Sequence, residues 1–283
     1  MTAISKNAVP RPILKWAGGK RQLLGELIPR ISFPSKYCTY HEPFFGGGAL
    51  FFELARTNCL PSKVRISDSN HALVEVYSEV RQDVSKVIEL LQRHREIHCK
   101  EHFYEIRSRD PSNSPAYARA ARVIYLNKTC FNGLYRVNAR GEFNVPFGKY
   151  SNPTICDEAN LVAVSEALAG VEIEACTFES VLAHADAGDF VYFDPPYHPV
   201  SKTSSFTAYA KSGFGVRDQN RLFDLCQKLD ACGVWFLLSN SDTDFIRLLY
   251  KGYKIETVLA KRSINSNGAG RGAIQEVLIS NYK

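Results

Sequence analysis

Short runs of strand-forming residues alternate with helical patterns along most of this chain, and this alternation constrains the fold more than any other feature. Such alternation is typical of a mostly parallel, doubly wound α/β sheet. The expected strands are 40–42, 64–68, 171–176, 190–194, 234–240, 253–260 and 273–282. The expected helices around them are 23–30, 49–56, 217–231 and 243–249. The last two strands are so close in sequence that an antiparallel hairpin is favoured over a helical crossover.

The alternation stops between about residues 70 and 160, where the sequence contains no convincing buried strand. Helical patterns at 84–98, 102–109 and 115–127 precede a segment, 131–150, that is rich in Gly, Asn, Arg and aromatic residues. This order predicts a helical lobe with a long loop or hairpin, inserted between the second and third strands. We therefore expect a discontinuous main domain, residues 1–72 and 160–283, and an inserted domain, residues 73–159.

The net charge of +6 is unevenly distributed along the 283 residues. Segments 1–36 and 80–150 each carry +6, whereas 37–79 carries −2 and 151–283 carries −4. Basic segments on an otherwise acidic chain indicate a polyanionic partner, although charge alone favours this no more than a solvated lysine-rich face. No apolar run approaches the roughly 20 residues of a membrane helix, and we expect no membrane partner.

The cysteines do not follow a disulfide or zinc pattern. The 8 Cys residues include no C-x-x-C pair, and Cys38, Cys130, Cys176 and Cys226 stand in apolar surroundings. This usage indicates buried free thiols in a reducing cytosol.

Three histidines, His94, His98 and His102, recur at every fourth position and could line one helix face. Three imidazoles can bind zinc, but the sequence offers no accompanying carboxylate. We expect no metal site.

Two motifs near the N-terminus suit a nucleoside cofactor. Residues 42–48, Glu-Pro-Phe-Phe-Gly-Gly-Gly, follow the first strand, and Asp68 ends the next strand, where nucleoside-binding α/β folds place a ribose-hydroxyl acceptor. Residues 15–20, Lys-Trp-Ala-Gly-Gly-Lys, lack the Ser or Thr of a phosphate loop, because Arg21 follows Lys20. A tryptophan and a lysine on a small-residue turn would suit S-adenosylmethionine, which carries a cation, a carboxylate and an adenosine.

The segment Asp194-Pro195-Pro196-Tyr197 follows the apolar run Phe-Val-Tyr-Phe. An exocyclic amine on a base is a poor nucleophile, because its lone pair is delocalised into the ring. Hydrogen bonds from that amine to the Asp194 carboxylate and the Pro195 carbonyl would localise the lone pair and direct it at a methyl donor. Tyr197 would supply a stacking face for a base taken out of the helix.

Together these motifs resemble the Dam-type D-P-P-Y DNA N6-adenine methyltransferases over nearly the whole chain. The segments that match in the family's order are 15–20, 42–48, Asp68, 194–197, Ser239-Asn240 and Arg262-Ser263-Ile264. The resemblance implies a Rossmann-like methyltransferase sheet with an inserted target-recognition domain, S-adenosylmethionine as the cofactor and duplex DNA as the partner. It assigns catalysis to Asp194, Pro195 and Tyr197. It assigns cofactor binding to Trp16, Lys20, Phe44, Asp68, Phe178 and Asp194.

Residues 132–138 and 140–150 are similar to the recognition hairpin of the GATC-specific members. Arg136 matches the position that reads guanine, whose two major-groove acceptors fit an arginine fork. The resemblance implies DNA contacts from Phe131, Leu134, Arg136, Asn138, Arg140, Pro146 and Lys149. Of these, Phe131 would insert beside the flipped adenine, Leu134 and Pro146 would touch bases, and Arg140 and Lys149, together with Lys128, would contact phosphates.

We therefore expect a mostly monomeric, cytoplasmic, nucleoid-associated methyltransferase that flips adenine out of GATC in duplex DNA. One alternative keeps the chemistry but acts on RNA adenine or a protein glutamine. A second alternative is a catalytically silent, sequence-specific DNA-binding protein. A nicotinamide oxidoreductase fits least, because the G-x-G-x-x-G pattern is absent.

Overall fold

The computed structural model describes residues 8–16, 18–200, 213–260 and 274–282. Ala17 and the segment Arg262-Ser263-Ile264 therefore lie outside the described residues. The chain divides into two compact units. The helical unit comprises residues 1–19, 46–59 and 70–175, and the sheet unit comprises residues 20–45, 60–69 and 176–283. The assignment of residues 73–159 to target recognition is a statement about function, and it stays a prediction.

The sheet has seven strands in the order β3-β2-β1-β4-β5-β7-β6. The strands are β1 (Thr39–Glu42), β2 (Lys63–Asp68), β3 (Glu172–Ala175), β4 (Phe190–Phe193), β5 (Trp235–Ser241), β6 (Lys254–Ala260) and β7 (Ile274–Ser280). β1 pairs in parallel with β2 and β4, and β4 pairs in parallel with β5. β7 is antiparallel to both β5 and β6. The predicted mostly parallel sheet and its terminal antiparallel pair are confirmed.

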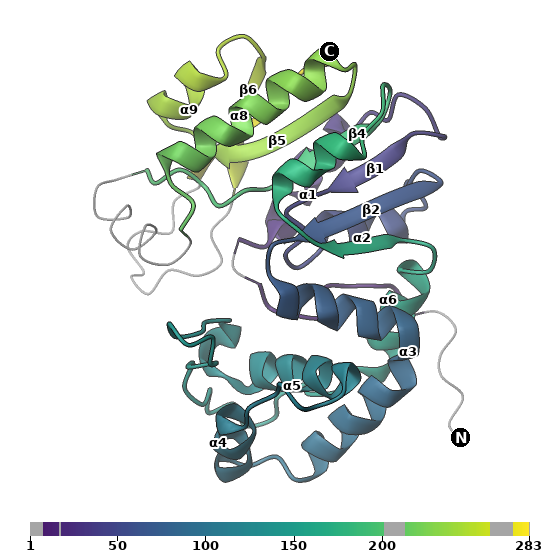
Figure 1. Cartoon of the computed structure of the whole chain (residues 1–283), viewed down its shortest axis with the longest axis vertical. Coiled ribbons are helices and arrows are strands. Elements are labelled where there is room, and N and C mark those ends of the chain that lie inside the picture. Colours follow the sequence, from purple (N-terminus) through teal and green to yellow (C-terminus); the bar gives the residue numbers. More distant parts are fainter. Residues whose placement is uncertain (1–7, 17, 201–212, 261–273, 283) are drawn as a thin grey trace. The chain divides into compact units, whose positions relative to one another are not determined.

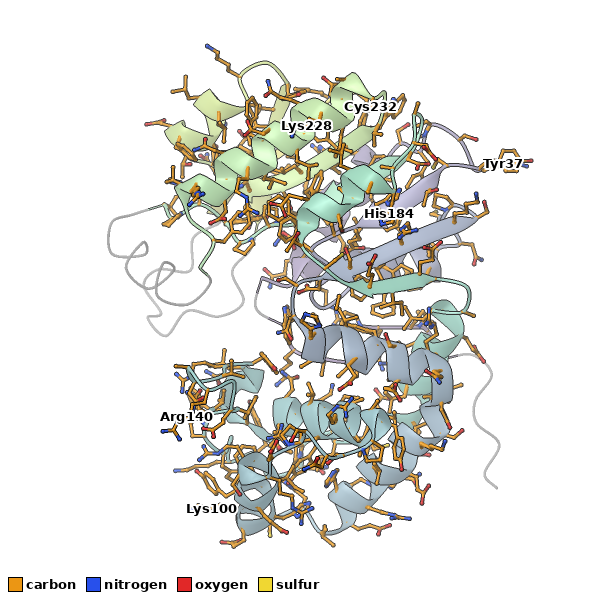
Figure 2. All side chains as sticks on the ribbon, viewed as in Figure 1. Tyr37, Lys100, Arg140, His184, Lys228 and Cys232 are labelled. Carbon is orange, nitrogen blue, oxygen red and sulfur yellow. The ribbon has the colours of Figure 1, made fainter. Side chains whose placement is uncertain are left out.

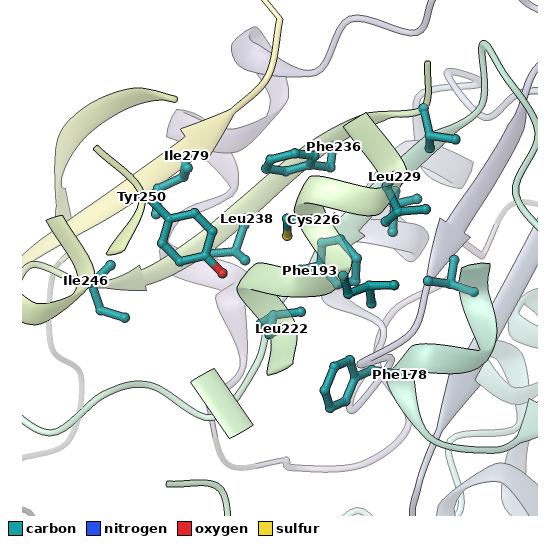
Figure 3. Close-up of a cluster of buried hydrophobic side chains, with 14 of the residues drawn as sticks. Phe178, Phe193, Leu222, Cys226, Leu229, Phe236, Leu238, Ile246, Tyr250 and Ile279 are labelled. Atoms are coloured by element: carbon teal, nitrogen blue, oxygen red, sulfur yellow. The ribbon is translucent and has the colours of Figure 1, made fainter. Parts of the chain in front are cut away.

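The centre of the sheet unit is apolar on both faces of the sheet. All four residues of β4 are buried, as expected for a parallel strand covered by helices on both sides. Helix α8 (Val216–Ala231) places Leu222, Cys226 and Leu229 on one face, at helical spacing. Figure 3 shows these side chains with Phe193 and Phe236 in one hydrophobic cluster. This core fixes α8 against β4 and β5.

The other helices of the sheet unit are short and follow or precede strands. They are η1 (Lys20–Gln22), α1 (Leu24–Leu27), η2 (Ile28–Arg30), η4 (Phe178–Ala183) and α9 (Asp244–Leu249). Because β1, β2, β4 and β5 run in parallel, their carboxyl ends share one edge of the sheet. That edge carries Glu42, Asp68, Asp194 and Asn240.

The helical unit is built around one long kinked helix. It contains α2 (Ala49–Arg56), α3 (His71–Glu96), α4 (Lys100–Ser108), α5 (Ala116–Thr129), η3 (Phe131–Gly133) and α6 (Glu158–Ala167) (Figure 1), and strand β3 also falls within its residues. Helix α3 has non-helical backbone angles at Asp83, and the predicted helix 84–98 matches only the part after this kink. The earlier part buries Leu73, Val76 and Val80. Its valine-rich pattern did not indicate a helix, since β-branched residues favour strands.

All eight cysteines lie in the described residues and are free thiols, which confirms the absence of disulfides. Cys38, Cys130 and Cys226 are buried as predicted, whereas Cys176 is half-buried. No helix in the described ranges is long and apolar enough to cross a bilayer.

Candidate active site

Asp194 follows the last residue of the buried strand β4 and receives two hydrogen-bond donors on one oxygen. The Lys20 ammonium lies 2.7 Å from Asp194 Oδ1, and the Ser239 hydroxyl of β5 donates to the same oxygen at 3.2 Å. The side chains of Lys20 and Asp194 are only 10% and 18% exposed. The structure therefore brings together two residues that are far apart in sequence, at the edge of the sheet that the motif predicted.

The electrostatic state of Asp194 reflects two opposing effects. Burial raises the pKa of the carboxyl above its usual value, whereas the adjacent Lys20 ammonium and the Ser239 hydroxyl lower it. The net direction is upward. Lys20 therefore limits the rise and favours the ionised carboxylate, which is the form that accepts hydrogen bonds from an amine.

Tyr197 lies beside this ion pair. The Lys20 ammonium is 4.4 Å from the centroid of the Tyr197 ring, a cation–π distance, and the phenol donates to Glu276 Oε2 at 2.9 Å. Burial, followed by the charge of Asp194, raises the pKa of Tyr197 well above its usual value, so the phenol stays protonated. The motif gave no indication of Glu276, on β7, because it comes 79 residues after Tyr197.

The backbone of the same turn is held by buried polar side chains. Gln219 of α8 donates to the Pro196 carbonyl at 2.9 Å, and the His198 amide donates to Asn240 Oδ1 at 3.0 Å. Asn240 Nδ2 donates to Gln219 Oε1 at 3.1 Å, which joins the two side chains. Asn240 lies in a segment that matched the family pattern, but nothing in the sequence indicated Gln219.

The predicted cofactor-binding aromatics form a second group in the sheet unit. Phe44 stacks on Phe178 with ring centroids 5.2 Å apart, and Phe214 packs edge-on against Phe44 at 5.8 Å. Asp68 ends β2, and its carbonyl accepts from the Cys176 amide at 3.2 Å. An acidic side chain at a strand end and an aromatic cluster in the same unit fit a ribose and an adenine ring.

Trp16 belongs to the helical unit. Its ring lies 5.2 Å from that of Tyr135, and a Cβ added to Gly47 would approach the Trp16 Cβ to 3.3 Å. Gly48 precedes α2 at φ +66°, a left-handed conformation that favours glycine. Within this unit, the glycine-rich turn therefore provides close packing against Trp16.

The predicted reading segment forms a hairpin-like loop. Residues Cys130 and Phe147 form one antiparallel bridge, and Val137 and Phe143 form another. The Phe131 amide donates to the Pro146 carbonyl at 2.8 Å, which closes the base of the loop. The hairpin alternative in the prediction for residues 131–150 is confirmed.

Six of the seven hairpin residues with predicted DNA contacts are exposed, and the seventh, Asn138, is half-buried. The exposed fractions of Phe131 and Leu134 are 50% and 43%. Arg136 donates from Nε to Asn144 Oδ1 at 2.6 Å and from Nη2 to the Asn144 carbonyl at 3.2 Å. These bonds use the Nε–H and one N–H of Nη2. The two N–H groups of Nη1 and the second N–H of Nη2 can still donate to another acceptor.

The remaining hairpin positions are polar and mostly on the surface. Asn138 accepts from the amides of Arg140 and Glu142, a local turn that exposes the Arg140 side chain at the outer edge of the helical unit (Figure 2). Lys149 has φ +52° and an exposed side chain. Lys128 differs, because burial lowers the pKa of its ammonium.

The three regularly spaced histidines do not share a helix face, so that expectation was wrong. Helix α3 ends before His98, and His102 belongs to α4, because the chain turns between them. His94 Nδ1 lies 2.9 Å from His102 Nε2, and His98 Nδ1 lies 2.9 Å from the Tyr125 hydroxyl. No metal-binding group of three or more His, Cys, Asp or Glu occurs in the part of the chain that the structure describes.

A mostly parallel sheet with a D-P-P-Y turn at its carboxyl edge defines the class of amino methyltransferases. Within that class, residues 16–264 match the family model for D12 class N6 adenine-specific DNA methyltransferases. The chain therefore belongs to the D12 class of N6 adenine-specific DNA methyltransferases.

Individual relatives align along almost their entire lengths. The type II methyltransferase M1.LlaDCHI of Lactococcus lactis subsp. cremoris is 42% identical over 100% of this chain and 99% of its own. The type II methyltransferase M.MjaIII of Methanocaldococcus jannaschii is 46% identical over 96% of this chain and 99% of its own. The DNA adenine methylase of Escherichia coli K12 is 35% identical over 95% of this chain and 94% of its own.

Proposed function

We propose that this adenine methyltransferase uses S-adenosylmethionine to methylate the flipped adenine of GATC in duplex DNA. The observation that carries the proposal is the Asp194 carboxylate, held by Lys20 and Ser239 beside the ring of Tyr197. A carboxylate and an aromatic face at one turn are what an exocyclic amine on a planar base requires.

The chain's own residues would bind and orient the target base. Asp194 and the Pro195 carbonyl would accept the two amine protons, which localises the nitrogen lone pair. Tyr197 would stack on the base, with its ring orientation fixed by Glu276. No covalent intermediate with the enzyme is required, and no cysteine adjoins the turn.

S-adenosylmethionine would supply a methyl group on a positively charged sulfur. The donor set fits this molecule: Asp68 at a strand end suits the ribose hydroxyls, and the Phe44–Phe178 pair suits an adenine ring. Lys20 and Asp194 offer one cation and one anion to a ligand that carries both charges. Trp16 stays a proposed cofactor contact on the basis of the family resemblance.

The hairpin supports direct reading of bases. The free end of the Arg136 guanidinium matches guanine N7 and O6, and exposed Phe131 and Leu134 offer apolar surface to unstacked bases. We assign Asn138 and Pro146 to the same reading surface, and Arg140 and Lys149 to the phosphates. The preference for GATC rests on this hairpin.

Two observations argue against the alternatives. The family and the relatives' names concern DNA, which disfavours RNA adenine and protein glutamine as substrates. An intact Lys20–Asp194 pair disfavours a silent DNA-binding protein. Free thiols suit the cytoplasm, where we also expect the protein to act as a monomer.

The proposal can be tested with methyl-labelled S-adenosylmethionine. The substrates are a GATC duplex and matched duplexes in which one base pair of the site is changed. We expect N6-methyladenine in the GATC duplex and at least about tenfold less label in each changed duplex. Equal labelling of all duplexes would reject GATC specificity, and label on cytosine would reject the assigned chemistry.

A further inference from the structure

The D-P-P-Y turn is held at nearly every residue by side chains from other elements of the sheet unit. Ser239 and Lys20 hold Asp194, Gln219 holds the Pro196 carbonyl, and Glu276 holds the Tyr197 hydroxyl. At the following residue, His198, Asn240 accepts from the amide and the Ser241 hydroxyl donates to the carbonyl. The anchors come from η1, α8, β5 and β7.

The amides of Gln219 and Asn240 are the buried link in this arrangement. Gln219 is 1% exposed and Asn240 is 0% exposed, although amide side chains are mostly found at the surface. A buried amide is costly unless its donors and acceptors are satisfied. Here each amide uses both its oxygen and its nitrogen within the network around the turn.

The direction of the hydrogen bonds is fixed by the backbone. The amides of His198 and Ser241 can only donate, so they require the oxygen of Asn240. The nitrogen of Asn240 must then face the oxygen of Gln219, and the nitrogen of Gln219 must face the Pro196 carbonyl. At positions 219 and 240, only an amide side chain supplies both the donor and the acceptor that these bonds need without a change of protonation.

The same network leaves the chemically relevant acceptors available. Both donors on Asp194 reach Oδ1, and no described residue donates to Oδ2 or to the Pro195 carbonyl. These are the two acceptors that the amine of a bound adenine would use. The neighbouring carbonyl, that of Pro196, already accepts a hydrogen bond from Gln219.

We propose that Gln219 and Asn240 are positioning residues for methyl transfer, which hold the Pro195 carbonyl and Asp194 in the geometry that the target amine requires. This inference rests on the proposed function of the turn. Neither side chain touches substrate. Both act through the backbone of residues 196–198, and their removal should slow the chemical step while leaving cofactor and DNA affinity nearly unchanged.

The first test compares Gln219→Ala and Asn240→Asp with the wild-type enzyme in single-turnover methylation of an adenine duplex. Asn240→Asp keeps the acceptor for His198 but loses the donor to Gln219. We expect the rate of transfer to fall at least about tenfold in both variants, because small displacements of reacting groups are costly. Dissociation constants for cofactor and DNA should stay within about threefold of the wild-type values.

The matched control is Asn281→Ala. Asn281 accepts from the Phe236 amide and donates to Asp230 and the Val234 carbonyl, so it makes three hydrogen bonds near the start of β5, against two for Gln219, far along the strand from the turn. It should lose thermal stability without losing transfer rate at a temperature well below its Tm. Equal rate losses for Asn281→Ala and Gln219→Ala would indicate a merely structural role and overturn the proposal.

A third variant, Gln219→Glu, should give a pH dependence of the transfer rate that a loss of stability does not produce. A protonated carboxyl can still donate to Pro196 and accept from Asn240, whereas a carboxylate repels the Pro196 carbonyl. The transfer rate of Gln219→Glu relative to wild type should therefore fall as pH rises, and that of Gln219→Ala should not change with pH. A pH-independent ratio for Gln219→Glu would contradict the assigned donor.

The outcomes separate this inference from the proposed function. If the wild-type enzyme puts no label on adenine, the proposed function fails and the positioning role fails with it. If the wild-type enzyme labels adenine and the folded Gln219 and Asn240 variants transfer methyl at wild-type rates, only the positioning role is rejected.

Discussion

The D-P-P-Y turn and the hairpin of residues 131–150, to which we assign chemistry and base reading, are built in opposite ways. At the turn, Asp194 and Tyr197 are mostly buried and bonded to side chains from several elements. On the hairpin, Phe131 and Arg136 are exposed, and Arg136 is supported by Asn144 of the same hairpin. Chemistry benefits from groups fixed before the substrate arrives. Base reading requires side chains that can enter a groove, and the DNA itself completes their contacts.

The sharpest test of this comparison is Asp194→Ala. Removing the carboxylate should lower the transfer rate by at least about a thousandfold, because the target amine loses its charged acceptor. Single-turnover methylation measures the effect. Asp244→Ala, in the first turn of α9, removes a carboxylate from the same unit and should leave the rate unchanged. Substantial turnover by Asp194→Ala would remove Asp194 from its assigned role.

The second test concerns specificity rather than rate. Arg136→Ala should reduce discrimination between GATC and a duplex with a changed guanine by about 10- to 100-fold, the value of one bidentate contact. Competition between the two duplexes in one methylation assay measures it. If discrimination persists, Arg136 does not read guanine, and the role of the hairpin must be reassigned.

The third test separates phosphate contacts from base contacts within the hairpin. Arg140→Ala should weaken binding to all sequences by a similar factor and reduce the slope of log K against log salt by about 1. Titrations at several salt concentrations, with and without GATC, provide the measurement. A change that depends on sequence would mean that Arg140 contacts a base.

The smallest expected effect concerns the support beneath the hairpin. Burial, followed by the charge of His102, lowers the pKa of His94 to about 4. Between pH 6.5 and about 4, His94 therefore binds a proton in the unfolded chain but not in the folded chain. Its contribution to the free energy of unfolding is fully present above pH 6.5 and is lost as the pH falls through this range. We expect the Tm to fall by about a few degrees. His94→Gln should show a smaller fall between pH 7 and pH 5 than the wild-type protein.

The strands with clear local sequence patterns were predicted well. The expected strands 190–194 and 234–240 correspond closely to β4 and β5, because these apolar runs are too short for a helix and are rich in aromatic and β-branched residues. The first half of α3 and the helix α6 were missed. In α3, valines that favour strands in isolation are helical because they pack against other helices, and local propensity is a weak guide where burial decides.

The sequence by itself determined the class of the protein, since the order of its motifs and the alternation of strands and helices point to one family. Only the tertiary structure decided which residues support the turn. Gln219, Asn240 and Glu276 come from separate elements and contact residues 194–198 only after the chain folds. The physical reason is that a motif requires a short stretch of chain, whereas positioning depends on hydrogen bonds between side chains far apart in sequence. The same applies to Lys20. The sequence indicated Lys20 and Asp194 in separate motifs, but it did not predict the ion pair between them.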